Sequence, residues 1–374
     1  MFKITNGKRG IKMADIKKIA VLSSGGDAPG MNAAIRAVAR KASDLGIEAV
    51  GVVGGYKGLV YENLIPLGPR NVSNIINRGG TMLYTDRCLE FVTEEGMQKA
   101  IDTCKRNNID AIVAIGGDGT FRGATDLAVR GIPTVGVTGT IDNDITATDY
   151  TVGFDTAMNT VLELTDRLRD TCESHARVNV IEVMGRHCGQ IALCAGIASG
   201  SIATIIPEMS FDEDEIIDRI KAARERGKRG MIVMVSEGVF VKDENGKEIP
   251  YAEVITDKLK NEHGFDVKFV RSAHILRGGT PTLRDRLTAT RMGVHAMELI
   301  AEGKSNLVVI ENDGRIETLD IVFALTADRL YKGTLKEGDL DKFDAEQIAA
   351  MEAIAEKRRR EIAELYAVAN DVAL

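Results

Sequence analysis

Tryptophan is absent from this chain, proline is scarce, and long apolar segments are missing. The 374 residues include only 7 Pro, and aromatic residues make up 5%. No apolar stretch approaches the roughly 18 residues that indicate a membrane-spanning helix. The basic N-terminus lacks the apolar region of a signal peptide. The composition therefore argues against a membrane protein and against a proline-rich linker.

Paired cysteines are also missing. The chain has five cysteines, and no two of them form a CxxC pair. An odd, scattered set in a large chain predicts reduced thiols and a cytoplasmic location, not a disulfide framework. These residues are Cys88, Cys104, Cys172, Cys188 and Cys194.

A basic surface for nucleic acid is not expected, because the net charge is −7 and the pI is about 5.5. A small anionic substrate stays open. A few converging arginines can attract such a substrate locally in spite of a mildly acidic average.

Apolar segments of strand length alternate with amphipathic segments of helix length. The strand-like segments are 19–24, 49–55, 111–117, 134–139, 178–185, 203–208, 231–238 and 306–312, and helix-like segments are 29–46, 94–108, 155–172 and 212–227. Because many strand-like segments are continuously apolar, we expect parallel strands buried on both faces. The predicted class is α/β, with two doubly wound, Rossmann-like lobes, largely parallel sheets and a cleft between the lobes.

Polar interruptions suggest the domain boundaries. We expect an N-terminal extension over 1–15, a first lobe over 16–150 plus about 283–335, and a second lobe over 151–282. The charged segment 336–374 is expected to be a helical extension whose apolar stripe contains Ala350, Ile354, Ile362 and Leu365. Its KRRRE run is interpreted as a solvated helix face.

Two glycine-rich loops follow strand-like segments and open helices. The loop SSGGDAPGMNAA (23–34) has Gly25 and Gly26, which allow the backbone to approach a phosphate, although a tight turn alone would also need them. The loop IGGDGTFRGAT (115–125) sets Asp118 among glycines, which suggests Mg²⁺ beside a nucleotide. The P-loop pattern GxxxxGK[ST] is absent.

A third loop, GTIDNDI (139–145), carries Asp142, Asn143 and Asp144 at a strand end. A carboxylate there is placed to take a proton from an attacking hydroxyl, and an Asx-type turn is the structural alternative. A fourth group is basic: Arg177, Arg186 and Arg277 lie beside strand ends or in glycine-flanked loops, and Arg suits a bidentate grip on phosphate.

Taken together and in order, SGGDAPGMNAAIR, INRGGT, GGDGT, GTIDND, MGR and RGGTP resemble the bacterial ATP-dependent 6-phosphofructokinase family. The resemblance runs from about Ile16 to about Leu330. It implies transfer of a phosphoryl group from Mg-ATP to the 1-hydroxyl of fructose 6-phosphate, giving fructose 1,6-bisphosphate and ADP in glycolysis. It also implies a homotetramer with active sites completed across subunits.

The resemblance implies three sets of site residues. The ATP set is Gly26, Tyr56, Arg87, Cys88, Gly117, Asp118, Gly119 and Thr120, with Mg²⁺ on Asp118. The catalytic set is Asp142 as the base, assisted by Thr140 and Asp144, with Arg87 and Arg186 on the transferring group. The sugar-phosphate set is Thr140, Ile141, Asp142, Met184, Gly185, Arg186, Glu237, His274, Ile275, Leu276 and Arg277, with Arg177 and Lys268 reaching from a neighbouring subunit.

The chain departs from the family pattern at two positions. Lys268 stands where many relatives carry Arg, so bidentate geometry is lost there, and Arg271 is a nearby substitute. Ile202 replaces an effector-site Glu. The remaining matches to basic effector positions, for ADP or phosphoenolpyruvate, are Arg36, Arg40, Arg169, Arg226 and Lys228.

Three alternatives remain at this point. A pyrophosphate-dependent member of the same family carries Asp at the position of Gly119 and Lys at that of Thr140, so both residues favour ATP. A NAD or lipid kinase shares GGDGT but leaves GTIDND, MGR and RGGTP unexplained. A catalytically silent, ligand-binding paralogue is disfavoured because Asp118 and Asp142 are both present.

Overall fold

The apolar segments form the strands of two separate sheets. The computed structural model describes residues 15–373, so the predicted extension 1–15 lies, apart from Asp15, outside the described residues. All eight predicted strand segments contain a strand. Central strands such as β4 (Ala111–Gly116) and β6 (Val178–Val183) are buried at every position, as expected for parallel strands covered on both faces.

The first lobe is built on a sheet of seven strands in the order β13-β12-β5-β4-β1-β2-β3. Besides β4, these are β1 (Lys18–Ser23), β2 (Glu48–Val52), β3 (Leu64–Pro66), β5 (Thr134–Thr138), β12 (Leu307–Asn312) and β13 (Arg315–Asp320). The five inner strands are parallel, and the two edge strands β3 and β13 run antiparallel to their neighbours.

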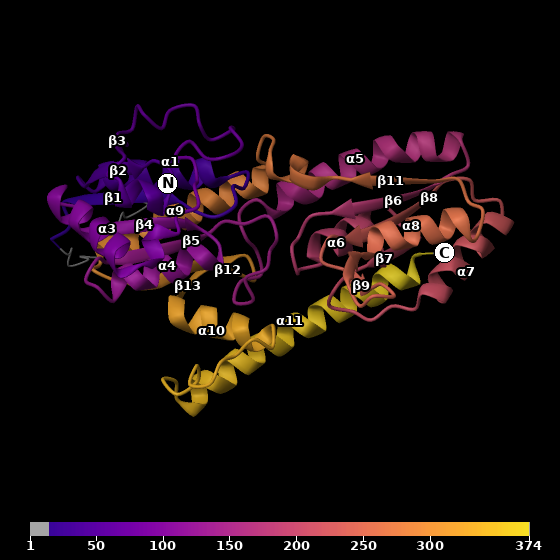
Figure 1. The fold of residues 1–374 in the computed structure, drawn as a ribbon. Coiled ribbons are helices and arrows are strands. Elements are labelled where there is room, and N and C mark those ends of the chain that lie inside the picture. Colours follow the sequence, from indigo (N-terminus) through magenta and orange to yellow (C-terminus); the bar gives the residue numbers. More distant parts are fainter. Residues whose placement is uncertain (1–14, 374) are drawn as a thin grey trace, which may run out of the picture.

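The second lobe has a parallel sheet of four strands in the order β11-β6-β8-β7. Besides β6, these are β7 (Ala203–Ile205), β8 (Met231–Ser236) and β11 (Val267–Arg271). A small hairpin, β9 (Phe240–Lys242) with β10 (Glu248–Pro250), lies beside it. The two sheets confirm the predicted two-lobed, doubly wound class (Figure 1).

Helices connect and cover the strands. They are α1 (Met31–Asp44), α2 (Tyr56–Val60), α3 (Glu94–Arg106), α4 (Asp118–Ala128), α5 (Phe154–Ser174), α6 (Gln190–Ala198), α7 (Glu213–Glu225), α8 (Tyr251–Asn261), α9 (Leu283–Ala301), α10 (Ile321–Tyr331) and α11 (Ala345–Asp371), with short 3₁₀ turns η1 (Glu90–Val92) and η2 (Ala273–Arg277). After the second sheet the chain returns to the first lobe, where α9 packs on α1 and β12 pairs with β5.

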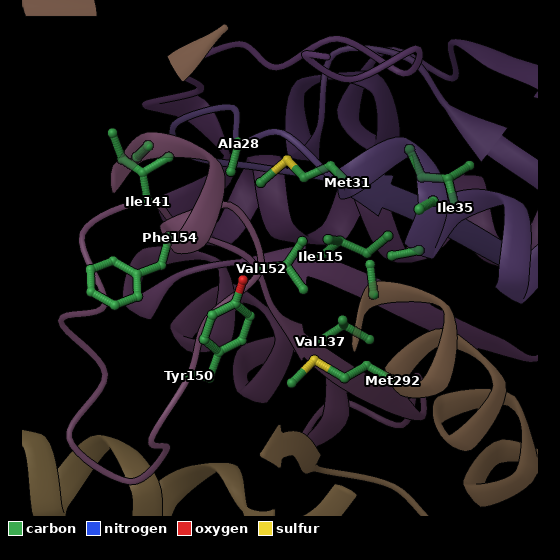
Figure 2. Close-up of a cluster of buried hydrophobic side chains, with 14 of the residues drawn as sticks. Ala28, Met31, Ile35, Ile115, Val137, Ile141, Tyr150, Val152, Phe154 and Met292 are labelled. Atoms are coloured by element: carbon green, nitrogen blue, oxygen red, sulfur yellow. The ribbon is translucent and has the colours of Figure 1, made fainter. Parts of the chain in front are cut away.

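Apolar side chains form a core beneath the loops at the strand ends. Met31 and Ile115 pack with Val137, Val152 and other buried residues from α1, β4, β5 and the segment before α5 (Figure 2). This core holds the ends of β1, β4 and β5 at fixed positions, so the loops that follow them start from a rigid frame.

The C-terminal segment forms a long helix, as predicted, but with a different buried face. Helix α11 begins at a capping box between Asp344 and Gln347 and crosses beneath both lobes (Figure 1). Ala350 and Leu365 of the predicted stripe are exposed. The buried positions are Met351, Ala355, Arg358, Ile362 and Ala369. The prediction that KRRRE is a solvated face is therefore wrong for Arg358.

Strands missed from the sequence are short or polar. In β11 and β13, charged residues break the continuous apolar pattern that identified the others. Within residues 15–373, no helix is long and apolar enough to cross a membrane.

Candidate active site

The loop after β1 meets the second lobe at a glycine. A Cβ atom at Gly26 would lie 1.9 Å from Nη1 of Arg277, which follows the second sheet. The two lobes also approach each other at a pair of glycines, Gly79 and Gly279. A Cβ atom at Gly79 would lie 2.2 Å from the carbonyl oxygen of Gly279. Predicted phosphate-binding loops of the two lobes thus touch each other.

The loop after β4 is hydrogen-bonded to the loop after β1 and has free space beside Gly119. Thr120 Oγ1 donates to the carbonyl of Ser24 at 2.9 Å, which ties this loop to the loop after β1. No atom lies within 4 Å of a Cβ built on Gly119, so free space faces this residue. Asp118 is 24% exposed and pairs with Arg122 on the next turn of α4. The loop can therefore admit a ligand next to a carboxylate.

Tyr56, a member of the predicted ATP set, packs against the loop after β4. Its ring is buried and stacks on Phe91 at a centroid distance of 4.2 Å. Its hydroxyl donates to the carbonyl of Thr120 at 2.5 Å. The side chain thus supports the Gly117–Thr120 loop through its hydroxyl. Arg87 is exposed and Cys88 half-buried in the loop before η1.

The loop after β5 has a strained and heavily bonded backbone. Asn143 has a φ of 50°, which non-glycine residues rarely adopt. Its amide nitrogen donates to Gln190 Oε1 at 2.7 Å, at the start of α6 in the second lobe. Thr151 Oγ1 donates to the carbonyl of Thr140 at 2.6 Å. Such strain persists where the surroundings hold it, and it clusters at functional sites.

Asp142 on this loop is a buried carboxylate with unused hydrogen-bonding capacity. It is 2% exposed, and its Oδ1 has no hydrogen-bond partner in the part of the chain that the structure describes. Burial, reinforced by the neighbouring Asp144, raises the pKa of Asp142 to about 6, while Arg277 and Arg186 oppose the rise. A partly desolvated carboxylate with a free oxygen is suited to accept a proton.

Asp144 lies among charges from both sides of the site. Burial raises its pKa, the negative charges of Asp328 and Asp118 add to the rise, and Lys332 and Arg186 oppose it. Arg186 Nη1 is 3.8 Å from Asp144 Oδ2. The charges of the loops after β4 and β6 therefore both act on Asp144.

In the second lobe, Glu237 fixes the loop after β6. Its Oε1 accepts the backbone N–H of Gly185 at 3.2 Å and of Arg186 at 2.8 Å. Arg186 has a φ of 55° and an exposed side chain. Met184, Glu237 and His274 line a cavity of ≈ 320 Å³. The backbone of this loop is thus fixed, and the exposed guanidinium of Arg186 can reach a ligand.

The predicted sugar-phosphate residues differ in their exposure. Ile141 and Leu276 are completely buried, whereas Ile275 is exposed. His274 is exposed and Arg277 half-buried in η2, beside the loop after β1.

Arg177 and Lys268 lie at the amino-terminal end of the strands of the second sheet, opposite the end at which the site residues lie. Arg177 precedes β6, and Lys268 pairs in register with Asn179 near the start of that strand, five residues before Met184. Both side chains contact Asp266, at 2.5 Å and 3.2 Å. The structure does not bring them to this chain's own site. Arg271 is held by Glu182 and Glu253 instead.

The predicted effector cations are divided between the lobes. Arg36 and Arg40 lie on α1, and burial, with the nearby charge of Arg40, lowers the pKa of Arg36. Arg169 is on α5, and Arg226 and Lys228 follow α7, on the other lobe (Figure 1). Ile202 is buried in the core of the second lobe. One chain alone does not assemble these residues into a site.

The residues near Asp118 fit a magnesium ion that is carried by a phosphate ligand. Mg²⁺ binds through one or two carboxylates and completes its shell with phosphate oxygens and water. Asp118 is partly exposed beside the open space at Gly119, and its charge acts on Asp144. Over residues 15–373, no group of three or more His, Cys, Asp or Glu side chains forms a self-contained metal site.

Two cations that contact the loop after β5 were missed from the sequence. Lys332 Nζ donates to the carbonyl of Asp144 at 3.0 Å, and Arg358 donates to the carbonyls of Thr148 and Ile145. Both lie in the C-terminal segment, where no glycine loop or strand end pointed to a role.

Glycine loops and carboxylates at the ends of parallel strands, facing cations from a second lobe, define a phosphoryl-transfer site of an α/β enzyme. A sequence profile described as phosphofructokinase matches residues 18–300. The chain belongs to the phosphofructokinase family.

Relatives match along most of their own length. ATP-dependent 6-phosphofructokinase of Clostridioides difficile is 48% identical over 316 residues, which are 84% of this chain and 96% of the relative. ATP-dependent 6-phosphofructokinase 1 of Clostridium perfringens is 50% identical over 322 residues, 86% of this chain and 98% of the relative. Phosphofructokinase from Saccharomyces cerevisiae superposes with a TM-score of 0.78 at 33% identity, covering 90% of this chain and 50% of the longer yeast chain.

Proposed function

We propose that this protein transfers the terminal phosphoryl group of ATP to the 1-hydroxyl of fructose 6-phosphate, giving fructose 1,6-bisphosphate and ADP in glycolysis. One observation carries the proposal: Asp142 is a buried carboxylate with a free oxygen, next to the cations Arg186 and Arg277. The matched relatives are named ATP-dependent 6-phosphofructokinases.

The oxygen of the sugar 1-hydroxyl attacks the terminal phosphorus of ATP, and Asp142 accepts the proton of that hydroxyl. The bond between the terminal phosphorus and the bridging oxygen breaks, and this oxygen leaves with ADP. Thr140 and Asp144 assist, and Arg87 and Arg186 offset the charge on the transferring group. The open space at Gly119 gives room for the nucleotide phosphates. Asp118 holds Mg²⁺, which neutralises phosphate charge when bound. Positioning and charge neutralisation supply most of the acceleration.

The remaining predicted residues keep their proposed roles. Nucleotide contacts come from Gly26, Cys88, Gly117 and Thr120, with Tyr56 as a support. Sugar contacts come from Met184, Gly185, Glu237, His274 and Arg277, together with Ile141, Ile275 and Leu276. We assign ATP to the lobe formed by 16–150 and 283–335, and the sugar phosphate to 151–282.

Assembly is the second part of the proposal. Arg177 and Lys268 lie away from this chain's own site, which fits donation to the sugar phosphate of a neighbouring copy in a homotetramer. The effector cations would meet across copies in the same way. We place the activity in the cytoplasm, where its substrates are made and used.

A steady-state assay of fructose 6-phosphate with ATP, GTP and pyrophosphate in turn, each with and without ADP, tests the proposal. We expect turnover with ATP and Mg²⁺ and none with pyrophosphate. Activity with pyrophosphate alone would overturn the donor assignment, and no turnover with any donor would favour a silent binding paralogue. Size-exclusion chromatography with light scattering tests the tetramer.

A further inference from the structure

The loop that carries Asp142 is gripped by the C-terminal part of the chain. We name residues 139–149 the base loop. Its backbone carbonyls of Asp144, Ile145 and Thr148 all accept hydrogen bonds from cations beyond residue 330. The family profile ends at residue 300, before these cations.

Helix α10 and the residue after it provide the first contact. Lys332 Nζ lies 3.0 Å from the carbonyl of Asp144 and 2.7 Å from Asp328 Oδ2. The other oxygen of Asp328 accepts the hydroxyl of Thr146 at 2.7 Å and its N–H at 3.3 Å. Asp328 is buried, so this pair joins α10 to the middle of the base loop away from solvent.

Helix α11 provides the second contact. Arg358 is only 7% exposed, and its guanidinium donates to the carbonyls of Thr148 and Ile145. Lys357 Nζ lies 3.0 Å from Asp149 Oδ1. A buried guanidinium is stable only where its N–H groups find acceptors, so Arg358 favours the loop conformation that presents both carbonyls.

The same helix reaches the second lobe. Beyond Arg358, α11 packs on α6 and β7. Helix α6 begins at Gln190, whose side chain accepts the amide of Asn143 on the base loop. The base loop is thus held at Asn143 by α6 and at Thr148 by α11. Helix α11 also packs on α6.

We propose that Arg358 and Lys332 are positioning residues, which hold the base loop in the conformation that buries Asp142 and aims its free oxygen at the sugar hydroxyl. The inference rests on the proposed function, because it assigns to α10 and α11 a task in that reaction. Neither cation is assigned a contact with substrate. A base displaced by a fraction of an ångström loses turnover while ground-state binding is kept.

The test compares Arg358→Ala and Arg358→Lys with Arg360→Ala. Arg360 is exposed on the same helix and pairs only with Glu364 among its described neighbours, so it is the matched control. We expect Arg358→Ala to lower kcat on the order of 10-fold or more with KM changes below about 3-fold. Arg358→Lys keeps a donor and should recover part of the loss. Arg360→Ala should stay within about 2-fold of the wild type.

Hydrogen exchange gives a readout that does not depend on activity. Amide exchange of residues 139–149 should accelerate in Arg358→Ala, and exchange in β1 and β6 should not change. If Arg358→Ala does not fold, Arg358→Lys and Lys332→Met decide in its place, and both should lower kcat.

Two results would overturn the inference. One is a kcat of Arg358→Ala, or of both substitute variants, within about 2-fold of the wild type. The other is a loss confined to KM without faster exchange in the base loop. An inactive wild type would instead defeat the proposed function, and the exchange measurement would still test the grip on the loop.

Discussion

Asp118 and Asp142 follow neighbouring strands of one sheet and differ in their surroundings. Asp118 is partly exposed, pairs with Arg122 and faces open space at Gly119. Asp142 is buried, has one oxygen without a partner, and has a raised pKa. The fold supplies equivalent positions, and local packing leaves one carboxylate partly exposed and the other desolvated, which suits the proposed roles of metal ligand and base.

Removing the buried carboxylate should have the largest effect. Asp142→Ser is expected to lower turnover at least about 10²-fold, because the sugar hydroxyl loses its proton acceptor. KM for both substrates should change little. Asp218→Ser, an exposed change on α7, is the control. Near-normal turnover of Asp142→Ser would remove this residue from the mechanism.

Adding a charge at the open loop should affect only the donor. Gly119→Asp is expected to lower kcat/KM for ATP on the order of 10-fold or more, since a carboxylate there repels nucleotide phosphates. The KM for fructose 6-phosphate should stay unchanged. Gly119→Ala adds a methyl group where no atom lies within 4 Å, so it should be tolerated. Equal losses in both variants would indicate crowding and not charge.

Acidification should reveal the titration of the proposed base. The raised pKa of Asp142, about 6, means that the carboxylate gains a proton as pH falls through that value. We expect kcat/KM for fructose 6-phosphate to fall below about pH 6. The sugar phosphate itself titrates near pH 6. The affinity of the Asp142→Asn variant for fructose 6-phosphate, measured by calorimetry across the same pH range, gives the correction for titration of the sugar phosphate. A corrected profile that stays flat to pH 5 would contradict the assignment.

The smallest effect is expected at the Asp118–Arg122 pair. Exposed ion pairs contribute about 0.2–1 kcal/mol, which corresponds to at most about fivefold in affinity. Arg122→Ala should therefore lower the Mg²⁺ concentration for half-maximal rate by no more than that factor, because Asp118 is released. Activity titrated with Mg²⁺ at fixed ATP measures the shift, and Arg130→Ala on the same lobe is the control. A rise in the Mg²⁺ requirement would show that Arg122 helps to bind the donor.

The sequence predicted the buried strands and the polar loops that directly follow them. Continuous apolar segments predicted the buried strands, and glycine next to carboxylate predicted the loops after β4 and β5. Family resemblance supplied the roles of individual residues. Strand β11 escaped because charged residues interrupt its apolar pattern.

Long-range contacts were beyond sequence reasoning. Arg358 stands in a run of charges typical of a solvated helix, and its acceptor at Thr148 is 210 residues away. Only the folded chain reveals that this guanidinium is buried. Tyr56 is a similar case, since its hydroxyl is taken up by Thr120 on another helix.

The meeting of Gly79 and Gly279 has a mechanical consequence. Because neither residue has a side chain, the backbones of the two lobes approach each other directly there. A methyl group introduced at Gly79 would lie 2.2 Å from the opposing carbonyl and act as a wedge. The close approach of the two lobes at this point therefore depends on the missing Cβ of Gly79, whereas a Cβ on Gly279 would meet no atom within 4 Å.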